Sequence, residues 1–231
     1  MIEPTSFVMA ALILLAGGLA GITANWAADF LPRFANQPPA DLRRPMWRLA
    51  IPHWPPRRHH SDHVALVAQM TLVVGYLALW LMSDDPLTFV GLSLCLTYFL
   101  LVAIIDLKYR LVLDVMTIPA MIVAVMGHAL LPQGDLPAAL VGGGFTFGIF
   151  MATAYLRPND IGGGDIKLAA AIGLLLGFPA VLWGLLIGAG LGAVVLSWHA
   201  LRQRGCRITI AYAPYLSLGA MIALLFNPFV Q

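Results

Sequence analysis

The chain has 231 residues, the length of one sizeable soluble domain, but hydrophobic residues make up 60% of it and charged residues only 10%. Soluble domains carry about 25% charged residues, and the mean hydropathy here is +0.86, so the composition excludes an ordinary soluble protein. The formal net charge of +2 requires no surface for nucleic acid. We therefore expect no nucleic-acid partner and expect the lipid bilayer to be the main solvent of the fold.

Eight mainly apolar stretches follow one another along the chain, and a spanning helix needs roughly 20 such residues. Glu3 and no basic residue precede the first stretch, so it lacks the positive start of a secretory signal peptide and we expect it to be retained. The predicted spans cover about residues 7–26, 63–82, 87–105, 115–131, 136–155, 166–177, 179–201 and 208–226, the sixth being short. The fold class expected is an all-α polytopic membrane protein with about eight transmembrane helices.

A long polar segment, about residues 31–62, follows the first predicted span. It contains seven prolines and six arginines, and this proline density argues against a long helix. It is either a solvated loop that contacts lipid headgroups or a reduced cytoplasmic module that helps to admit a substrate. We expect three parts: a first transmembrane helix (1–30), a short polar cytoplasmic loop (31–62) and a seven-helix membrane domain (63–231).

Four histidines crowd the end of this loop and could be considered as zinc ligands. They are His53, His59, His60 and His63. No cysteine accompanies them, and their spacing fits no common zinc pattern. We therefore expect no metal site.

The distribution of basic residues predicts the orientation in the membrane. With the eight predicted spans, all 13 Lys and Arg residues fall on one side, and the opposite loops contain Asp84, Asp85 and Asp135. Basic residues near helix ends are retained on the cytoplasmic side, so both termini should face away from the cytoplasm. Cys206 then lies in a cytoplasmic loop and Cys95 within a span, which excludes a disulfide framework.

Glycines recur within two of the predicted spans, where small residues allow close packing of helices in a bilayer. They are Gly142, Gly143 and Gly144 in the fifth span and Gly184, Gly188 and Gly192 in the seventh. We expect helix packing inside the chain, with dimerisation through these faces as the alternative.

Two acidic residues stand at the ends of predicted spans. Asp106 ends the third, and Asp165 opens the sixth directly after three glycines. Placing an acidic group at the membrane boundary costs free energy unless the group is paired, is solvated or has a function, so each aspartate is a functional candidate. The alternative is an interfacial ion pair with Lys108, Arg110 or Lys167.

Both aspartates lie at cytoplasmic helix ends under the predicted topology, so they can share one depth. Two neighbouring carboxylates resist double ionisation, and one then holds a proton while the other remains a base. Such a pair can activate water against a peptide carbonyl and protonate the leaving amine. This chemistry requires no metal and no nucleotide.

Three motifs then resemble one family, the type IV prepilin peptidases, which are GxGD aspartyl proteases. Residues 162–165, followed by Lys167, match its Gly-x-Gly-Asp-x-Lys motif. Asp106 followed by residues 111–119 is similar to its first aspartate segment, and residues 211–219 look like its C-terminal proline-containing stretch. The resemblance covers about residues 63–226.

The resemblance implies that Asp106 and Asp165 are the catalytic pair. The residues implied to bind substrate or to support the site are Gly162, Gly163, Gly164, Lys167, Asp114, Pro119 and Pro214. The implied enzyme is an aspartic endopeptidase of the bacterial inner membrane that is active at the cytoplasmic side. Its implied partners are prepilin or pseudopilin precursors, from which it removes a basic leader while their apolar N-terminal helix lies in the bilayer.

Proteolysis of this kind is expected to require no cofactor. Many bacterial members also methylate the new N-terminus with S-adenosylmethionine and carry two zinc-binding Cys-x-x-Cys pairs in the first loop. Residues 31–62 contain no cysteine, so we expect methyl transfer to be absent or weak. S-adenosylmethionine would be a cofactor only if that activity is retained.

Asp114 is the alternative to Asp106 as the first catalytic aspartate. It lies eight residues further on, just before the fourth span. Its short acidic side chain could cap that helix at the positive end of the dipole, orient substrate or take part in catalysis.

Other functions of the whole chain also remain open. The chain could be a proton- or cation-coupled transporter that uses Asp106 and Asp165, a presenilin-like protease that cuts other membrane helices, or a nonenzymatic assembly subunit.

Overall fold

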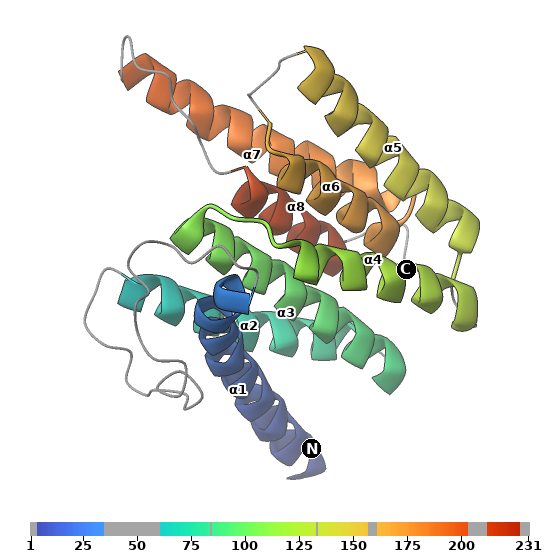
Figure 1. Cartoon of the computed structure of the whole chain (residues 1–231). Helices are drawn as coiled ribbons and strands as arrows, with labels where there is room; N and C mark the ends of the chain where they lie inside the picture. Colours follow the sequence, from blue (N-terminus) through green and yellow to red (C-terminus); the bar gives the residue numbers. More distant parts are fainter. Residues whose placement is uncertain are drawn as a thin grey trace. The chain divides into compact units, whose positions relative to one another are not determined.

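The computed structural model of the chain describes residues 4–34, 61–83, 85–132, 134–156, 161–202 and 212–226. Within these ranges the secondary structure is entirely helical (Figure 1). The eight helices are α1 (Pro4–Phe34), α2 (Ser61–Met82), α3 (Pro86–Tyr109), α4 (Asp114–Leu130), α5 (Leu136–Leu156), α6 (Gly163–Leu176), α7 (Ala180–Arg202) and α8 (Ala213–Leu225).

Three of these helices are long and apolar enough to cross a membrane: α1 over Met9–Pro32, α3 and α5. Shorter apolar helices follow in α2, α4, α7 and α8. In a bilayer the backbone must satisfy its hydrogen bonds within the segment, which favours helices throughout. The predicted fold class, an all-α polytopic membrane protein, is confirmed.

The boundaries differ from the predicted spans mainly at two ends. The first helix continues to Phe34, beyond the expected end at residue 26, and Trp26 stacks on Phe30 one turn later with ring centroids 4.9 Å apart. The last helix begins at Ala213 with Pro214 in its first turn, where the missing N–H of proline removes no helical hydrogen bond. Most of the predicted loop, residues 35–60, lies outside the described residues, so the three-part division stays a prediction.

The chain forms two compact units, Met1–Tyr109 and Arg110–Gln231. In the first unit, α1, α2 and α3 pack against one another around fully buried side chains that include Leu72, Leu96 and Phe99. The Tyr76 and Thr97 hydroxyls, 2.9 Å apart, hydrogen-bond between α2 and α3.

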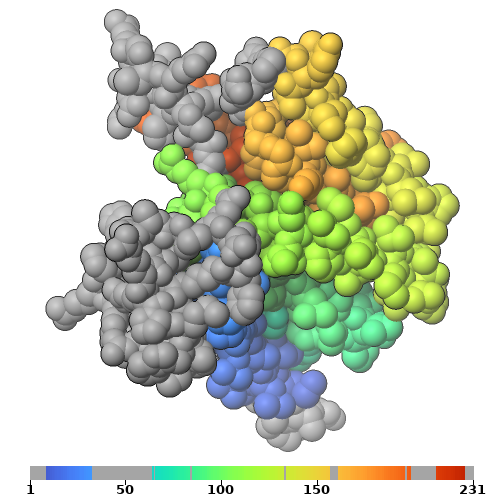
Figure 2. All heavy atoms as spheres, in the orientation of Figure 1, coloured from blue at the N-terminus to red at the C-terminus, as the bar shows by residue number. Residues whose placement is uncertain are grey.

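In the second unit, α6 packs against α4, α5, α7 and α8, and its residues Ile166 and Leu168–Gly173 are buried. Figure 2 shows the side chains of α5, in yellow, lying directly against those of α6, in orange. Asp165 therefore stands in the first turn of a helix that is enclosed by its neighbours.

Glycines make these close approaches possible, as predicted for helix packing. A Cβ atom on Gly142 would lie 2.9 Å from the Gly177 carbonyl carbon beside α6, and one on Gly188 would lie 2.8 Å from the Tyr215 carbonyl oxygen of α8. The expectation does not hold for Gly144, since no atom lies within 4 Å of the position of its Cβ.

Aspartates cap the N-termini of two helices, α3 and α5. The Thr88 backbone N–H donates to Asp85 Oδ2 at 2.8 Å, and the Ala138 N–H donates to Asp135 Oδ1 at 3.0 Å. Hydrogen bonds from Thr88 lower the pKa of Asp85. Both carboxylates thus accept hydrogen bonds from backbone N–H groups at helix N-termini.

Candidate active site

Asp106 lies in the last turn of α3 and is only 5% exposed. The four residues before it in the helix are buried as well. It is the one charged residue that is buried within the described ranges. Because removing a carboxyl group from water is costly, this placement supports the prediction that Asp106 has a function.

Lys108 follows two residues later, and its side chain forms hydrogen bonds to two residues of α1. Its Nζ donates to Asn25 Oδ1 at 2.7 Å and to Asp29 Oδ1 at 3.0 Å. The alternative that Lys108 serves to neutralise Asp106 is therefore weakened, because this ammonium already has a carboxylate partner in another helix.

Asp165 is half-buried in the first turn of α6, and the backbone of Gly162 begins that turn. The Asp165 N–H donates to the Gly162 carbonyl oxygen at 3.1 Å, and Gly162 itself has extended backbone angles. Among the described glycines only Gly177 has a positive φ, so the run before Asp165 uses backbone conformations open to any residue.

At position 164 a glycine is required by lack of space for a side chain. A Cβ atom there would lie 2.8 Å from the Val112 Cβ, closer than real Cβ atoms come to other atoms. The absence of a side chain lets the segment before α4 lie against the first turn of α6. Residues 162–165 and residues 111–119, two motifs that are distant in sequence, therefore meet in the structure.

A second contact joins the same two segments. Lys167 Nζ donates to both carboxylate oxygens of Asp114, at 2.7 Å and 2.8 Å. Asp114 is the first residue of α4, the N-cap position is Leu113, and no side chain caps this helix. The expectation that Asp114 caps α4 is thus not met, because its carboxylate turns to the ammonium on α6.

The two predicted prolines lie near helix starts. Pro119 lies inside α4, one turn after its beginning, and its side chain is exposed. Pro214 lies in the first turn of α8. Their expected part in substrate binding stays a prediction.

Tyr212 was not among the predicted site residues, although it lies in the stretch 211–219. Its ring contacts the backbone of α7, where a Cβ on Gly192 would lie 2.9 Å from the Tyr212 Cε2, and it packs on Phe150 with centroids 6.3 Å apart. Burial and, next, the charge of Asp165 raise the pKa of the Tyr212 hydroxyl. An aromatic residue directly before a proline-containing helix start is the signal that could have identified it.

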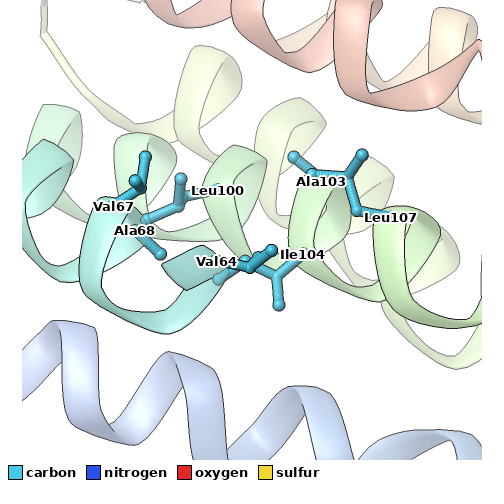
Figure 3. A pocket seen from close by; sticks show the side chains of 7 residues that line it. All are labelled: Val64, Val67, Ala68, Leu100, Ala103, Ile104 and Leu107. Atoms are coloured by element: carbon cyan, nitrogen blue, oxygen red, sulfur yellow. The ribbon is translucent and has the colours of Figure 1, made fainter. Parts of the chain in front are cut away.

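An apolar groove lies on the first unit between α2 and α3 (Figure 3). Its volume is about 240 Å³, and it is lined by Val64, Val67, Ala68, Leu100, Ala103, Ile104 and Leu107. These side chains offer no hydrogen-bond partner for an adenine, a ribose or an amino-acid group. The groove therefore does not fit S-adenosylmethionine.

Metal ligands were not expected, and within the described residues no three His, Cys, Asp or Glu side chains gather to hold a metal ion. His53, His59, His60 and Cys206, as well as the side chain of His63, lie outside the described part. Asp106 belongs to the first compact unit and Asp165 to the second. Their pairing stays a prediction.

Comparisons with known proteins agree with these motifs. A family model described as "Type IV leader peptidase family" matches residues 93–197. That range contains every predicted site residue except Pro214.

Curated relatives, among them the three that follow, carry the name "Prepilin leader peptidase/N-methyltransferase". The protein of Escherichia coli (strain K12) is 28% identical over 221 residues, which are 92% of this chain and 94% of the relative. That of Pectobacterium carotovorum subsp. carotovorum is 27% identical over 187 residues, 76% of this chain and 67% of the relative. That of Vibrio cholerae is 28% identical over 180 residues, which are 73% of this chain and 67% of the relative. No solved structure matches the chain significantly.

Proposed function

We propose that this chain, which a model of the type IV leader peptidase family matches over residues 93–197, is a membrane-embedded aspartic endopeptidase of the GxGD type. Its proposed substrates are type IV prepilin or pseudopilin precursors, from which it removes the leader peptide. The observation that carries the proposal is the burial of Asp106, a carboxyl group withdrawn from water inside the family-matched region. The similarity to leader peptidases favours this function over a transporter that would use the same aspartates.

In the proposed mechanism Asp106 and Asp165 act together. The ionised carboxylate takes a proton from a water molecule as the water oxygen bonds to the peptide carbonyl carbon, and the protonated carboxyl donates to the carbonyl oxygen. The C–N bond then breaks as a proton passes to the leaving amine. Each positioned acid or base contributes typically about 10²- to 10⁴-fold in rate, and two adjacent carboxyls share one proton as this scheme needs.

The contacts around α6 support Asp165 in this role. Lys167 is bound to Asp114, and the close approach of Gly164 to Val112 seats the segment before α4 on the same turn. One contact just before Asp165 in sequence and one just after it thus hold the first turn of α6 in position. Gly162, Gly163, Gly164, Lys167 and Asp114 are thus proposed as supporting residues, together with Pro119 inside α4 and Pro214 at the start of α8.

We place the cleavage at the cytoplasmic face of the bacterial inner membrane. The one-sided distribution of the 13 basic residues supports this orientation. The basic leader of the substrate would stay in the cytoplasm, while its apolar helix lies in the bilayer beside the peptidase. Proteolysis on this scheme uses no cofactor.

Methyl transfer is not part of the proposal. The relatives' names include an N-methyltransferase, but residues 31–62 contain no cysteine, so we expect methyl transfer to be absent or weak. S-adenosylmethionine would act as a cofactor only if the chain retains the second activity.

The test is direct cleavage by the purified, membrane-reconstituted protein. Candidate prepilins are incubated with it, and the new N-termini are sequenced. A single new terminus at the end of the basic leader, absent with Asp106→Asn, is expected. Intact precursors with correctly inserted wild-type protein across a panel of prepilins would contradict the proposal.

A further inference from the structure

Tyr212 stands directly before α8, and its ring is held between two other helices of the second unit. The ring packs on Phe150 of α5 with centroids 6.3 Å apart, and a Cβ atom on Gly192 of α7 would lie 2.9 Å from the Tyr212 Cε2. The missing side chain at position 192 thus leaves room for the ring against the α7 backbone. Both contacts are made by the ring carbons, so they do not depend on the hydroxyl.

The helices α6 and α8 pack against each other and run in the same direction (Figure 1). Three glycines of α7 meet α8 in reverse order of sequence, which makes α7 and α8 antiparallel. The pairs are Gly184 with Ala223, Gly188 with Leu216, and Gly192 with Tyr212. A short turn joins the end of α6 at Leu176 to the start of α7 at Ala180, so α6 also runs opposite to α7.

Equal lengths of helix place Asp165 and Tyr212 at the same level of this bundle. A Cβ atom on Gly184 would lie 3.1 Å from Leu176 Cδ1 and 3.5 Å from Ala223 Cβ, so α6 and α8 share a level at that point. Asp165 comes eleven residues before Leu176. Tyr212 comes eleven residues before Ala223. With a rise of 1.5 Å per residue, each therefore lies about 16 Å along its helix from the shared level.

The packing of α5 against α6 gives the same result independently. These two helices are antiparallel (Figure 1), and a Cβ atom on Gly173 of α6 would meet the Gly142 carbonyl of α5. Phe150 comes eight residues after Gly142, and Asp165 comes eight residues before Gly173. Phe150 therefore lies at the level of Asp165, and it is the residue that packs on the Tyr212 ring.

The Tyr212 hydroxyl is available to a bound substrate. The side chain is half-buried, and the hydroxyl makes no hydrogen bond to another residue of the described ranges, although a phenol withdrawn from water usually has a partner. Burial and, next, the charge of Asp165 raise the pKa of this hydroxyl. It therefore keeps its proton at neutral pH and is a hydrogen-bond donor near Asp165.

We propose that Tyr212 is a further catalytic residue, whose hydroxyl donates a hydrogen bond to the carbonyl oxygen of the scissile peptide bound at Asp165. The inference rests on the proposed catalytic role of Asp165. Negative charge develops on that oxygen as water adds to the carbonyl carbon, and a donor directed at it stabilises the transition state. The oxygen has two lone pairs, so it accepts from Tyr212 and from the protonated carboxyl together. Tyr212 keeps its own proton, and its role is the same whichever aspartate carries the shared one.

The first experiment measures kcat and KM for prepilin cleavage by Tyr212→Phe, which loses the hydroxyl and keeps the ring. We expect kcat to fall about 10²-fold, as on loss of one donor to a developing oxyanion, with KM close to that of the wild type. Tyr76→Phe is the matched control and should retain its kcat, because the Tyr76 hydroxyl bonds to the Thr97 hydroxyl within the first unit. A ring with a purely structural role predicts unchanged kcat per folded molecule in Tyr212→Phe, and that result overturns the proposal.

The position of the ring is tested by two variants in α7. The new methyl group of Gly192→Ala would displace the Tyr212 ring, so kcat should fall in this variant as well. Gly190→Ala should leave kcat unchanged, since no atom lies within 4 Å of the new Cβ. Equal kcat in the two variants contradicts the inference that the placement of the ring matters to the reaction.

A second readout does not depend on cleavage. A fluorinated tyrosine at position 212 keeps the hydroxyl, and fluorine NMR follows the ionisation of that phenol alone. Removing a neighbouring negative charge favours the phenolate, so Asp165→Asn should move the titration to lower pH by roughly 0.5 unit or more. Asp135→Asn should leave it in place, because that carboxylate caps the opposite end of α5 from Phe150.

The two claims can fail separately. A titration that is unchanged in Asp165→Asn shows that the phenol and the carboxylate are far apart, which overturns the inference on Tyr212 and leaves the proposed peptidase function standing. Normal cleavage by Asp165→Asn ends the proposed function, while the titration still reports whether Tyr212 lies beside Asp165.

Discussion

Lys167 Nζ lies 2.7 Å from Asp114 Oδ1 and 2.8 Å from Asp114 Oδ2, so the lysine of the glycine-aspartate motif bonds to the first residue of α4. Lys167 lies only two residues after Asp165, which would be its obvious partner from the sequence. The pair joins α4 to α6 across 53 residues of sequence. This contact agrees with the proposed supporting role of Asp114 and does not require Asp114 to be catalytic.

Replacing either candidate catalytic aspartate by asparagine should abolish cleavage. Asp106→Asn and Asp165→Asn preserve size but cannot exchange the proton, and each should cost about 10²- to 10⁴-fold in rate. Residues that act as one unit are non-additive, so the double variant should be little worse than either single variant. Turnover per correctly inserted molecule is the measurement, with binding of precursor as the control. Near-normal turnover in either single variant would refute the aspartyl mechanism.

The contact between Lys167 and Asp114 should contribute little to stability. Both side chains are largely exposed, at 45% and 58%, and exposed ion pairs are worth about 0.2–1 kcal/mol. A double-mutant cycle with Lys167→Met and Asp114→Asn, followed by thermal unfolding in detergent, should give a coupling in that range. Asp114→Asn should also lose much less activity than Asp106→Asn. An inactive Asp114→Asn beside an active Asp106→Asn would instead make Asp114 the first catalytic residue.

Gly164→Ala should impair cleavage because its new methyl group meets Val112. The Cβ atom would lie 2.8 Å from the Val112 Cβ, so the segment before α4 must move away from α6. Alanine is otherwise about 1 kcal/mol better than glycine in a helix, which makes any loss attributable to the contact. Adding Val112→Gly, which removes the contacting Cβ, should recover activity. Gly148→Ala in α5, where no atom lies within 4 Å of the new Cβ, is the control. Equal activity in Gly164→Ala and wild type would count against the contact.

Cleavage should survive strong zinc chelation. The loop 31–62 contains no cysteine, and the proposed mechanism uses only carboxyl groups and water. Initial rates with and without a membrane-permeant chelator provide the measurement. If activity disappears and returns with zinc, His53, His59, His60 and His63 become the candidate ligands.

Cys206 should be inaccessible from outside the cell. The basic residues around it, Arg202, Arg204 and Arg207, are expected to remain in the cytoplasm. An impermeant thiol reagent added to intact cells should therefore label Cys206 only after lysis, with a Cys206→Ser protein as the blank. Labelling before lysis would invert the predicted topology.

The sequence by itself determined the helices and the motifs. A bilayer forces each crossing segment to satisfy its backbone hydrogen bonds internally over roughly 20 apolar residues, so long apolar stretches such as the one in α3 identify helices without tertiary information. The glycines before Asp165 and the segment around Asp114 likewise carried the family resemblance, which the comparisons confirm over residues 93–197.

Only the tertiary structure decided the partners of the charged side chains. From the sequence, Lys108 and Lys167 are the natural counter-ions of Asp106 and Asp165, because the nearest opposite charges lie two residues away. Helix packing instead brings Asp29 to Lys108 from 79 residues away and Asp114 to Lys167 from 53 residues away. A long flexible side chain bonds to the acceptor that packing places within its reach, and packing depends on small-residue contacts such as Gly164 against Val112, whose partners no local pattern identifies.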